Sequence, residues 1–207
     1  MTRIAIIVGS TRPGRRATAV AQWVKEVANR HRTAASDGVT YELVDVADQG
    51  LPLLDEPLPP LFGQYTNPHT QRWSDTVSGF DGFVFVTPEY NHSVPAALKN
   101  ALDYLFAEWN DKAAGFVSYG VHGGTRAVEH LRVTLAELKV AGVRTQVALS
   151  VFTDFKIEDP TEHGLFTPGP HQEEALGELL DEVVAWSRAL APLRAAQEVS
   201  VPEPAQP

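Results

Sequence analysis

The sequence contains no cysteine. This absence excludes disulfides, thiolate metal sites, iron–sulfur clusters and cysteine nucleophiles, and leaves histidines and carboxylates as the candidates for metal binding. No stretch approaches the roughly 18 consecutive apolar residues of a membrane span. The apolar run at the N-terminus is short and ends at Gly9. We therefore expect a cytoplasmic protein without a signal peptide.

Positive charge is also scarce. The chain has 17 Lys and Arg against 26 Asp and Glu, a formal net charge of −9. Such a chain repels nucleic acid and anionic lipid, so we expect neither nucleic acid nor membrane as a partner. The arginines that do cluster, Arg12, Arg15 and Arg16, therefore indicate a small anionic ligand.

The remaining composition is that of an ordinary globular protein, with 43% apolar and 21% charged residues. A chain of 207 residues is long enough for one domain with a full hydrophobic core. We expect this domain to span residues 1–193. Residues 194–207 contain prolines at positions 202, 204 and 207, and this composition predicts a disordered C-terminal tail.

Short apolar runs alternate with helical patterns along the chain. The strand-like runs are residues 4–8, 40–46, 83–87, 116–119 and 146–152. The helical patterns are residues 17–32, 71–78, 96–106, 125–140 and 173–193. This alternation predicts an α/β fold, a three-layer doubly wound five-stranded parallel sheet of the flavodoxin-like order 2-1-3-4-5. Residues 51–60 are too rich in proline for a helix or a central strand, and we expect an ordered crossover or a lid there.

The loop after the first predicted strand is a candidate phosphate site. Residues 9–16 are rich in glycine, hydroxyl groups and arginine and lead directly into a helix. Such a loop presents free N–H groups and the positive end of the helix dipole to an anion. In an arbitrary loop these arginines would more simply be solvated, but ligands bind at this position of an α/β sheet. The dinucleotide and nucleoside triphosphate fingerprints are both absent, so a terminal monophosphate fits better.

The loop after the third predicted strand is a candidate site for a flat ring. Pro88 restricts the backbone, while Tyr90 offers an aromatic face and Asn91 offers hydrogen-bond donors and acceptors. An ordinary turn with Tyr90 packed in the core explains these residues equally well. Because the first and third strands are neighbours in the predicted order, both loops face one crevice. The glycine-rich loop 118–126 closes the same crevice.

Three motifs together resemble the NADPH-dependent FMN reductases, a flavodoxin-like family that includes quinone, azo-dye and chromate reductases. The motifs are residues 9–12, residues 88–91 followed by 95–103, and residues 118–120 with 123–124. The resemblance covers residues 3–150, and residues 108–124 are especially similar to the quinone reductases. It implies FMN as cofactor, NADPH or NADH as donor, and a ping-pong mechanism in which donor and acceptor use one crevice in turn.

The resemblance also implies roles for individual residues. Ser10 and Arg12 match ligands of the FMN phosphate, and Arg15 or Arg16 would be a further one, with Arg16 preferred. The remaining implied cofactor contacts are Pro88, Glu89, Tyr90 and Asn91 on one side of the ring and Ser118, Tyr119 and Gly120 along its other edge. Because the cofactor carries the redox chemistry, we predict no catalytic side chain and no metal ligand.

Several other functions fit the sequence less well. An acyl hydrolase lacks its Gly-x-Ser-x-Gly motif, and a zinc enzyme lacks His-Glu-x-x-His. A non-catalytic flavodoxin-type electron carrier and a flavin reductase that supplies reduced FMN to a monooxygenase are the alternatives. Arg126 and Arg132 suit a small anionic nucleotide and favour an enzyme over the carrier. The acceptor would be a quinone, an azo compound, a metal oxyanion or free flavin.

The predicted helix 95–106 carries many apolar side chains, including Leu98, Leu102 and Leu105. This excess predicts a homodimer or homotetramer across the helix, with the flavin near the interface. The family commonly forms dimers or tetramers. A helix that is simply well buried is the alternative. For His92, packing or a subunit contact is favoured over proton transfer.

Overall fold

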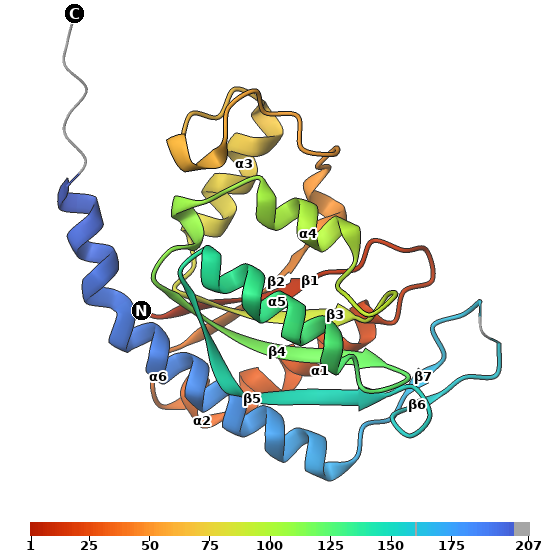
Figure 1. Cartoon of the computed structure of the whole chain (residues 1–207). Coiled ribbons are helices and arrows are strands. Elements are labelled where there is room, and N and C mark those ends of the chain that lie inside the picture. Colours follow the sequence, from red (N-terminus) through yellow and green to blue (C-terminus); the bar gives the residue numbers. More distant parts are fainter. Residues whose placement is uncertain (160, 201–207) are drawn as a thin grey trace, which may run out of the picture.

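The apolar runs of the sequence form the strands of one parallel sheet. In the computed structural model, which describes residues 1–159 and 161–200, the strand order is β2-β1-β3-β4-β5 (Figure 1). The predicted fold class and strand order are therefore confirmed. The strands are β1 (Arg3–Val8), β2 (Thr40–Asp45), β3 (Gly82–Pro88), β4 (Lys112–Gly120) and β5 (Val140–Ser150).

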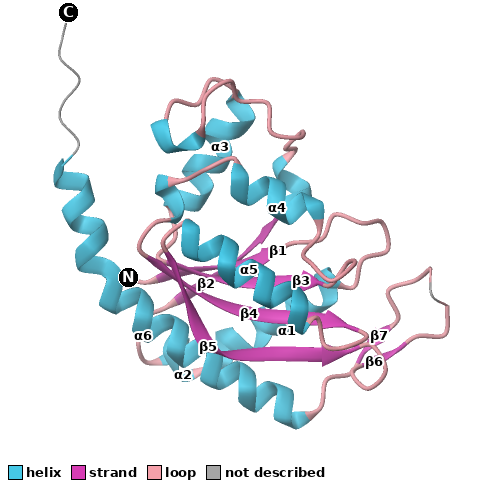
Figure 2. Cartoon of the chain, viewed as in Figure 1, coloured by secondary structure: helices cyan, strands magenta, loops and turns pink. Residues whose placement is uncertain are grey.

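Helices cover both faces of the sheet and create two separate cores (Figure 2). Successive side chains of a strand point to opposite faces, so Ile4 and Ile6 face one core while Ala5 and Ile7 face the other. The first core is covered by α1 (Ala17–Arg30), α2 (Arg32–Ala35) and α6 (Pro170–Ser200). The second is covered by α3 (Pro68–Ser78), α4 (Ala96–Asp103) and α5 (Thr125–Glu137).

Some element boundaries differ from the prediction. The helical pattern of residues 125–140 ends early, because Lys139 adopts a left-handed backbone (φ 53°) that no α-helix continues. Val140 is consequently the first residue of β5. The predicted helix 96–106 ends at Asp103 and is followed by the short 3₁₀-helix η3 (Ala107–Trp109).

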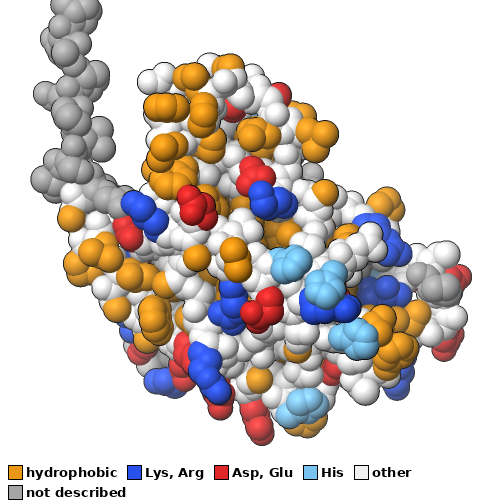
Figure 3. All heavy atoms as spheres, viewed as in Figure 1, with side chains coloured by type: hydrophobic (Ala, Val, Ile, Leu, Met, Phe, Trp, Pro, Cys, Tyr) orange, Lys and Arg blue, Asp and Glu red, His pale blue; other side chains and the backbone are white. Residues whose placement is uncertain are grey.

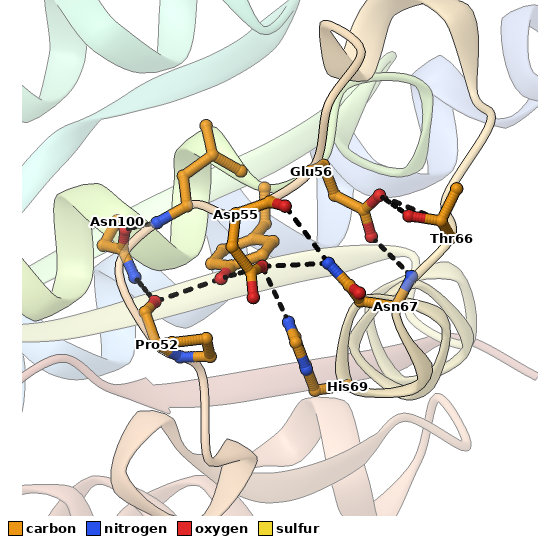
Figure 4. Close-up of polar contacts among 9 residues, drawn as sticks. Pro52, Asp55, Glu56, Thr66, Asn67, His69 and Asn100 are labelled. Atoms are coloured by element: carbon orange, nitrogen blue, oxygen red, sulfur yellow. Dashed lines mark hydrogen bonds and ion pairs between the residues drawn. The ribbon is translucent and has the colours of Figure 1, made fainter.

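The proline-rich segment is an ordered crossover, as expected (Figure 4). Between η1 (Val46–Gln49) and α3 it contains only the 3₁₀-helix η2 (Pro60–Phe62). Glu56 accepts hydrogen bonds from the N–H and hydroxyl of Thr66 at 2.9 and 2.7 Å and from the N–H of Asn67 at 2.9 Å. Further bonds tie the segment to α3 and α4 through Pro52, Leu54, Asp55, His69, Asn100 and Tyr104.

The C-terminal helix extends beyond the expected end of the domain. We expected a disordered tail from residue 194, whereas α6 continues to Ser200. Arg194, within this extension, donates to the carboxylate of Asp81 at 2.8 Å and to the backbone carbonyl of Asp111 at 2.9 Å. Pro192 lies within the helix on its exposed side and does not end it. Residues 201–207 of the expected tail lie outside the described part of the chain.

A small hairpin beyond β5 was not predicted. β6 (Phe155–Lys156) and β7 (Leu165–Phe166) pair in an antiparallel manner. The Phe166 ring lies 5.0 Å from that of Phe155 and 5.5 Å from that of Trp23 on α1, measured between centroids. These contacts hold the hairpin beside α1. None of the helices in the described residues is long and apolar enough to cross a membrane.

Candidate functional site

The loops that follow β1, β3 and β4 meet at the carboxyl edge of the sheet. Val8 pairs with Val86, and Pro88 pairs with Tyr119, so each strand ends beside its neighbour. Two backbone hydrogen bonds continue this pairing into the loops. The Gly9 N–H donates to the Val86 carbonyl at 2.9 Å, and the Glu89 N–H donates to the Tyr119 carbonyl at 3.1 Å. The crevice expected from the strand order is therefore present.

The loop after β1 is shaped by a glycine and leads to an open helix N-terminus. Gly14 has φ 66°, and a Cβ there would lie 2.9 Å from the carbonyl oxygen of Thr161. Only glycine fits both the backbone and this close approach. At the start of α1, Arg16 is the N-cap and makes no side-chain capping bond, so N–H groups of the first turn are left for a ligand.

The three arginines of this loop have different environments. Arg12 is exposed, and its guanidinium has no hydrogen bond or ion pair to any described residue. Arg15 is bound to the carboxylate of Asp45 and donates to the carbonyl of Ser10 at 2.7 Å. Arg16 donates to the carbonyl of Glu162 at 2.9 Å, while its Nε is buried without a partner. Arg12 and Arg16 therefore retain donors for an anion, whereas the charge of Arg15 is already balanced.

The loop after β3 makes a tight two-residue turn. Tyr90 and Ser93 exchange backbone hydrogen bonds of 2.9 and 3.1 Å around Asn91 and His92, whose φ angles are 49° and 73°. The Tyr90 hydroxyl lies 3.1 Å from that of Ser10, which is fully buried below the crevice. Tyr90 thus faces the loop after β1, and the interpretation of Tyr90 as an ordinary core residue does not hold.

Glu89 forms an ion pair with Arg126 at the start of α5. Burial of this carboxylate opposes ionisation, yet the adjoining guanidinium outweighs the burial and holds the pKa of Glu89 below its ordinary value. One carboxylate oxygen, Oε2, and the Nε of Arg126 are buried without partners. Both groups therefore have unused hydrogen-bonding capacity beside the crevice.

The loop after β4 provides one buried aromatic residue and a close backbone. Burial raises the pKa of Tyr119, which stays a neutral phenol. Gly120 approaches Gly124 and Glu89 so closely that an added Cβ would lie 3.3 and 3.4 Å from their atoms. The Ser118 hydroxyl donates instead to the carbonyl of Gly123 at 2.6 Å, and so points into its own loop.

Most of the predicted site residues line one cavity of about 220 Å³. Its lining includes Arg12, Arg16, Pro88, Glu89, Tyr90, Tyr119 and Gly120. Ser10 lies beneath Tyr90, whereas Asn91 and Ser118 do not line the cavity. A second, larger hollow of about 760 Å³ lies on the outer side of residues 11–15 and is bordered by His163. We regard the smaller cavity as the functional one, because the three strand-end loops converge there.

Several contributors to the site were not identified from the sequence. Asp45 is the last residue of β2 and lies at the same edge of the sheet. Its position at the end of a predicted strand could have indicated the ion pair with Arg15. Thr161 and Glu162 come from the segment between β6 and β7, whose polar sequence gave no such signal. Arg132, expected to suit a nucleotide, instead stacks on Phe116 at 4.4 Å and donates to the Val143 carbonyl.

Known proteins resemble this chain in sequence and in fold. Residues 2–154 match the model of a family described as NADPH-dependent FMN reductase. A relative from Schizosaccharomyces pombe, an NAD(P)H-dependent FMN reductase, is 40% identical over 86% of this chain and 84% of its own length. A 2-hydroxy-1,4-benzoquinone reductase from Burkholderia sp is 31% identical over 67% of this chain and 72% of its own length. A solved structure, the flavoenzyme NAD(P)H:(acceptor) oxidoreductase of Paracoccus denitrificans, shares the fold, with a TM-score of 0.66 and 22% identity; the match covers 91% of this chain and 98% of that one.

Proposed function

The chain belongs to the NADPH-dependent FMN reductase family, and from this membership we propose that it reduces quinones and related small acceptors by a ping-pong mechanism. It is an FMN-dependent oxidoreductase that uses NAD(P)H. The single observation that supports alternation is that the three strand-end loops converge on one small cavity of about 220 Å³, so donor and acceptor would share one place to bind. The name of the Burkholderia relative supports a quinone as acceptor.

The residues of the loop after β1 fit a flavin phosphate. The buried, unpartnered Nε of Arg16 and the free guanidinium of Arg12 both lie at an uncapped helix N-terminus. We propose Ser10, Arg12 and Arg16 as the phosphate ligands. Arg15 would act indirectly, because its bond to Asp45 and to the Ser10 carbonyl holds the loop in shape.

The other two loops would hold the ring. When bound, FMN supplies the redox chemistry by accepting two electrons from NAD(P)H and passing them to the acceptor. Pro88, Glu89, Tyr90, Tyr119 and Gly120 line the cavity and would position the ring. Asn91 and Ser118 would contribute through the shape of their turns, since neither lines the cavity.

Steady-state kinetics test the proposed alternation. Rates measured at several fixed NADPH concentrations against a benzoquinone should give parallel double-reciprocal lines. Intersecting lines would show that donor and acceptor bind together and would overturn the shared cavity. A flavin reductase that releases reduced FMN is the second candidate, supported by the name of the S. pombe relative. It would show saturation by added free FMN even when the enzyme is already loaded.

We also propose that the chain forms a homodimer or homotetramer, through a surface different from the one expected. Leu98, Leu102 and Leu105 of the α4 segment are buried within the chain and are not available to a second copy. The crossover instead exposes large apolar side chains, namely Leu53, Leu54, Leu58, Leu61 and Phe62. Because hydrogen bonds fix this segment, it presents a preformed apolar surface.

A further inference from the structure

Two histidines lie beside each other outside the cavity and have no role in the proposed reaction. His92 belongs to the Tyr90–Ser93 turn and His130 to α5, and their ring centroids are 5.7 Å apart. Figure 3 shows histidine side chains gathered on the face that carries α5. Two imidazoles that bind one Zn²⁺ at about 2.0–2.1 Å bring their ring centroids to roughly 5–6 Å from each other. The observed spacing of 5.7 Å falls within that range.

A serine fixes the orientation of one ring. His130 Nδ1 lies 3.1 Å from the hydroxyl of Ser93. An imidazole that donates through Nδ1 keeps the lone pair of Nε2 for a metal, an arrangement that metal-binding histidines almost always have. Because Ser93 belongs to the same turn as His92, this one hydrogen bond also limits the position of the second ring.

The backbone holds His92 in place at a conformational cost. Its φ of 73° lies in the left-handed region, which non-glycine residues other than Asn, Asp and His seldom adopt. The hydrogen bonds between Tyr90 and Ser93 maintain this conformation. Strained residues of this kind concentrate at functional sites.

The pair is accessible from solvent. Both rings are exposed, and neither forms an ion pair with a described residue. Within the described chain, no third His, Asp or Glu completes a group around a metal. His130 and Ser93 also border an open hollow of about 530 Å³, so this side of His130 is open to solvent.

We propose that His92 and His130 together bind one divalent transition-metal ion, with water in the other coordination positions. Imidazole nitrogen selects Zn²⁺, Ni²⁺ and Cu²⁺ over Mg²⁺ and Ca²⁺, which prefer oxygen. His92 follows Tyr90 and Asn91 directly, so a bound ion fixes the turn that borders the ring cavity. This site does not depend on the identity of the electron acceptor.

Calorimetric titration of the FMN-loaded full chain with ZnCl₂ tests the site. We expect one ion per chain, and a Kd at least about tenfold weaker in His92→Asn and in His130→Gln. Asn tolerates the left-handed backbone and Gln suits a helix, so both variants keep the fold. His171→Gln, at an exposed histidine of α6, is the matched control and should bind as the parent does.

Electron paramagnetic resonance with Cu²⁺ provides a second measurement. The parent should show coupling to two imidazole nitrogens, and each variant coupling to one. Absence of Zn²⁺ binding up to about 1 mM would overturn the proposal. So would a parent-like Kd in His92→Asn, because the ion would then be bound by His130 alone. Unchanged flavin absorbance and melting temperature in each variant establish that the fold is intact.

Discussion

The arginines of the loop after β1 allow the phosphate site to be tested one residue at a time. Arg12 has no partner among the described residues, so removing it breaks no internal contact. Arg12→Ala should weaken FMN binding by about 1.5–3 kcal/mol, the range of a charged hydrogen bond. Flavin fluorescence titration measures this change as a rise in Kd of roughly 10- to 100-fold.

Riboflavin and a distant arginine are the controls for this prediction. Riboflavin lacks the phosphate, so its affinity should change far less in Arg12→Ala. Arg30→Ala, at the other end of α1 in an exposed ion pair with Glu173, should leave FMN affinity unchanged. Equal losses for FMN and riboflavin would place Arg12 away from the phosphate.

Among the elements of the fold, the crossover after η1 depends on Glu56 (Figure 4). Burial alone would raise the pKa of Glu56, but the hydrogen bonds from Thr66 and Asn67 lower it to about 2. Because the pKa is lowered on folding, the carboxylate stabilises the fold at pH values above its ordinary pKa of 4.5. This stabilisation is lost as the pH falls toward 2.

Glu56→Gln should therefore be less stable by about 1–2 kcal/mol at pH 7. The difference in unfolding free energy between variant and parent should disappear as the pH falls below 4.5. Urea unfolding at a series of pH values measures both effects. Glu26→Gln, at a solvent-exposed residue of α1, should show no comparable gap. A gap for Glu56→Gln that stays constant down to pH 2 would contradict the role of the charge.

Helix α6 can be tested through its arginines. Arg194 is largely buried and bridges Asp81 and Asp111, whereas Arg188 pairs with Asp37 on the surface. We expect Arg194→Ala to lower the free energy of unfolding by about 1.5–3 kcal/mol, and Arg188→Ala by less than about 1 kcal/mol. Thermal melts of the two variants make the comparison. Equal effects would mean that the last part of α6 does not contribute to the domain.

Local sequence patterns predicted the five-stranded sheet but not the β6–β7 hairpin or its contact with the loop after β1. Apolar runs separated by helical periods left few topologies for a parallel sheet, and the chain length favoured the five-stranded order 2-1-3-4-5 over a six-stranded one. The hairpin β6–β7 has strands of two residues each, too short for any periodic signal. Likewise the contact of Arg16 with Glu162 joins residues 146 positions apart, which no local motif reveals. The site loops were predictable, whereas the direction of the Ser118 hydroxyl required the tertiary structure.

For the whole molecule, the exposed apolar surface of the crossover predicts assembly. Leu61 and Phe62 are 64% and 61% exposed, and water contact with such side chains is removed when a second copy covers them. Replacing both residues with lysine should shift the protein from a dimer or tetramer to a monomer in sedimentation velocity. Leu193→Lys, at a half-exposed leucine of α6, is the control and should leave the assembly unchanged. A parent that sediments as a monomer would refute the proposal.

The contact between Arg16 and Glu162 also sets an order of events during synthesis on the ribosome. Arg16, in the proposed phosphate loop, is translated 146 residues before Glu162, whose carbonyl accepts from it. Chains fold from the N-terminus as they emerge, so the early strands are exposed before the site has its last contact. A nascent chain that stalls before Glu162 therefore lacks this part of the phosphate site. On the proposed assignment of this loop to the FMN phosphate, cofactor capture therefore follows the synthesis of Glu162.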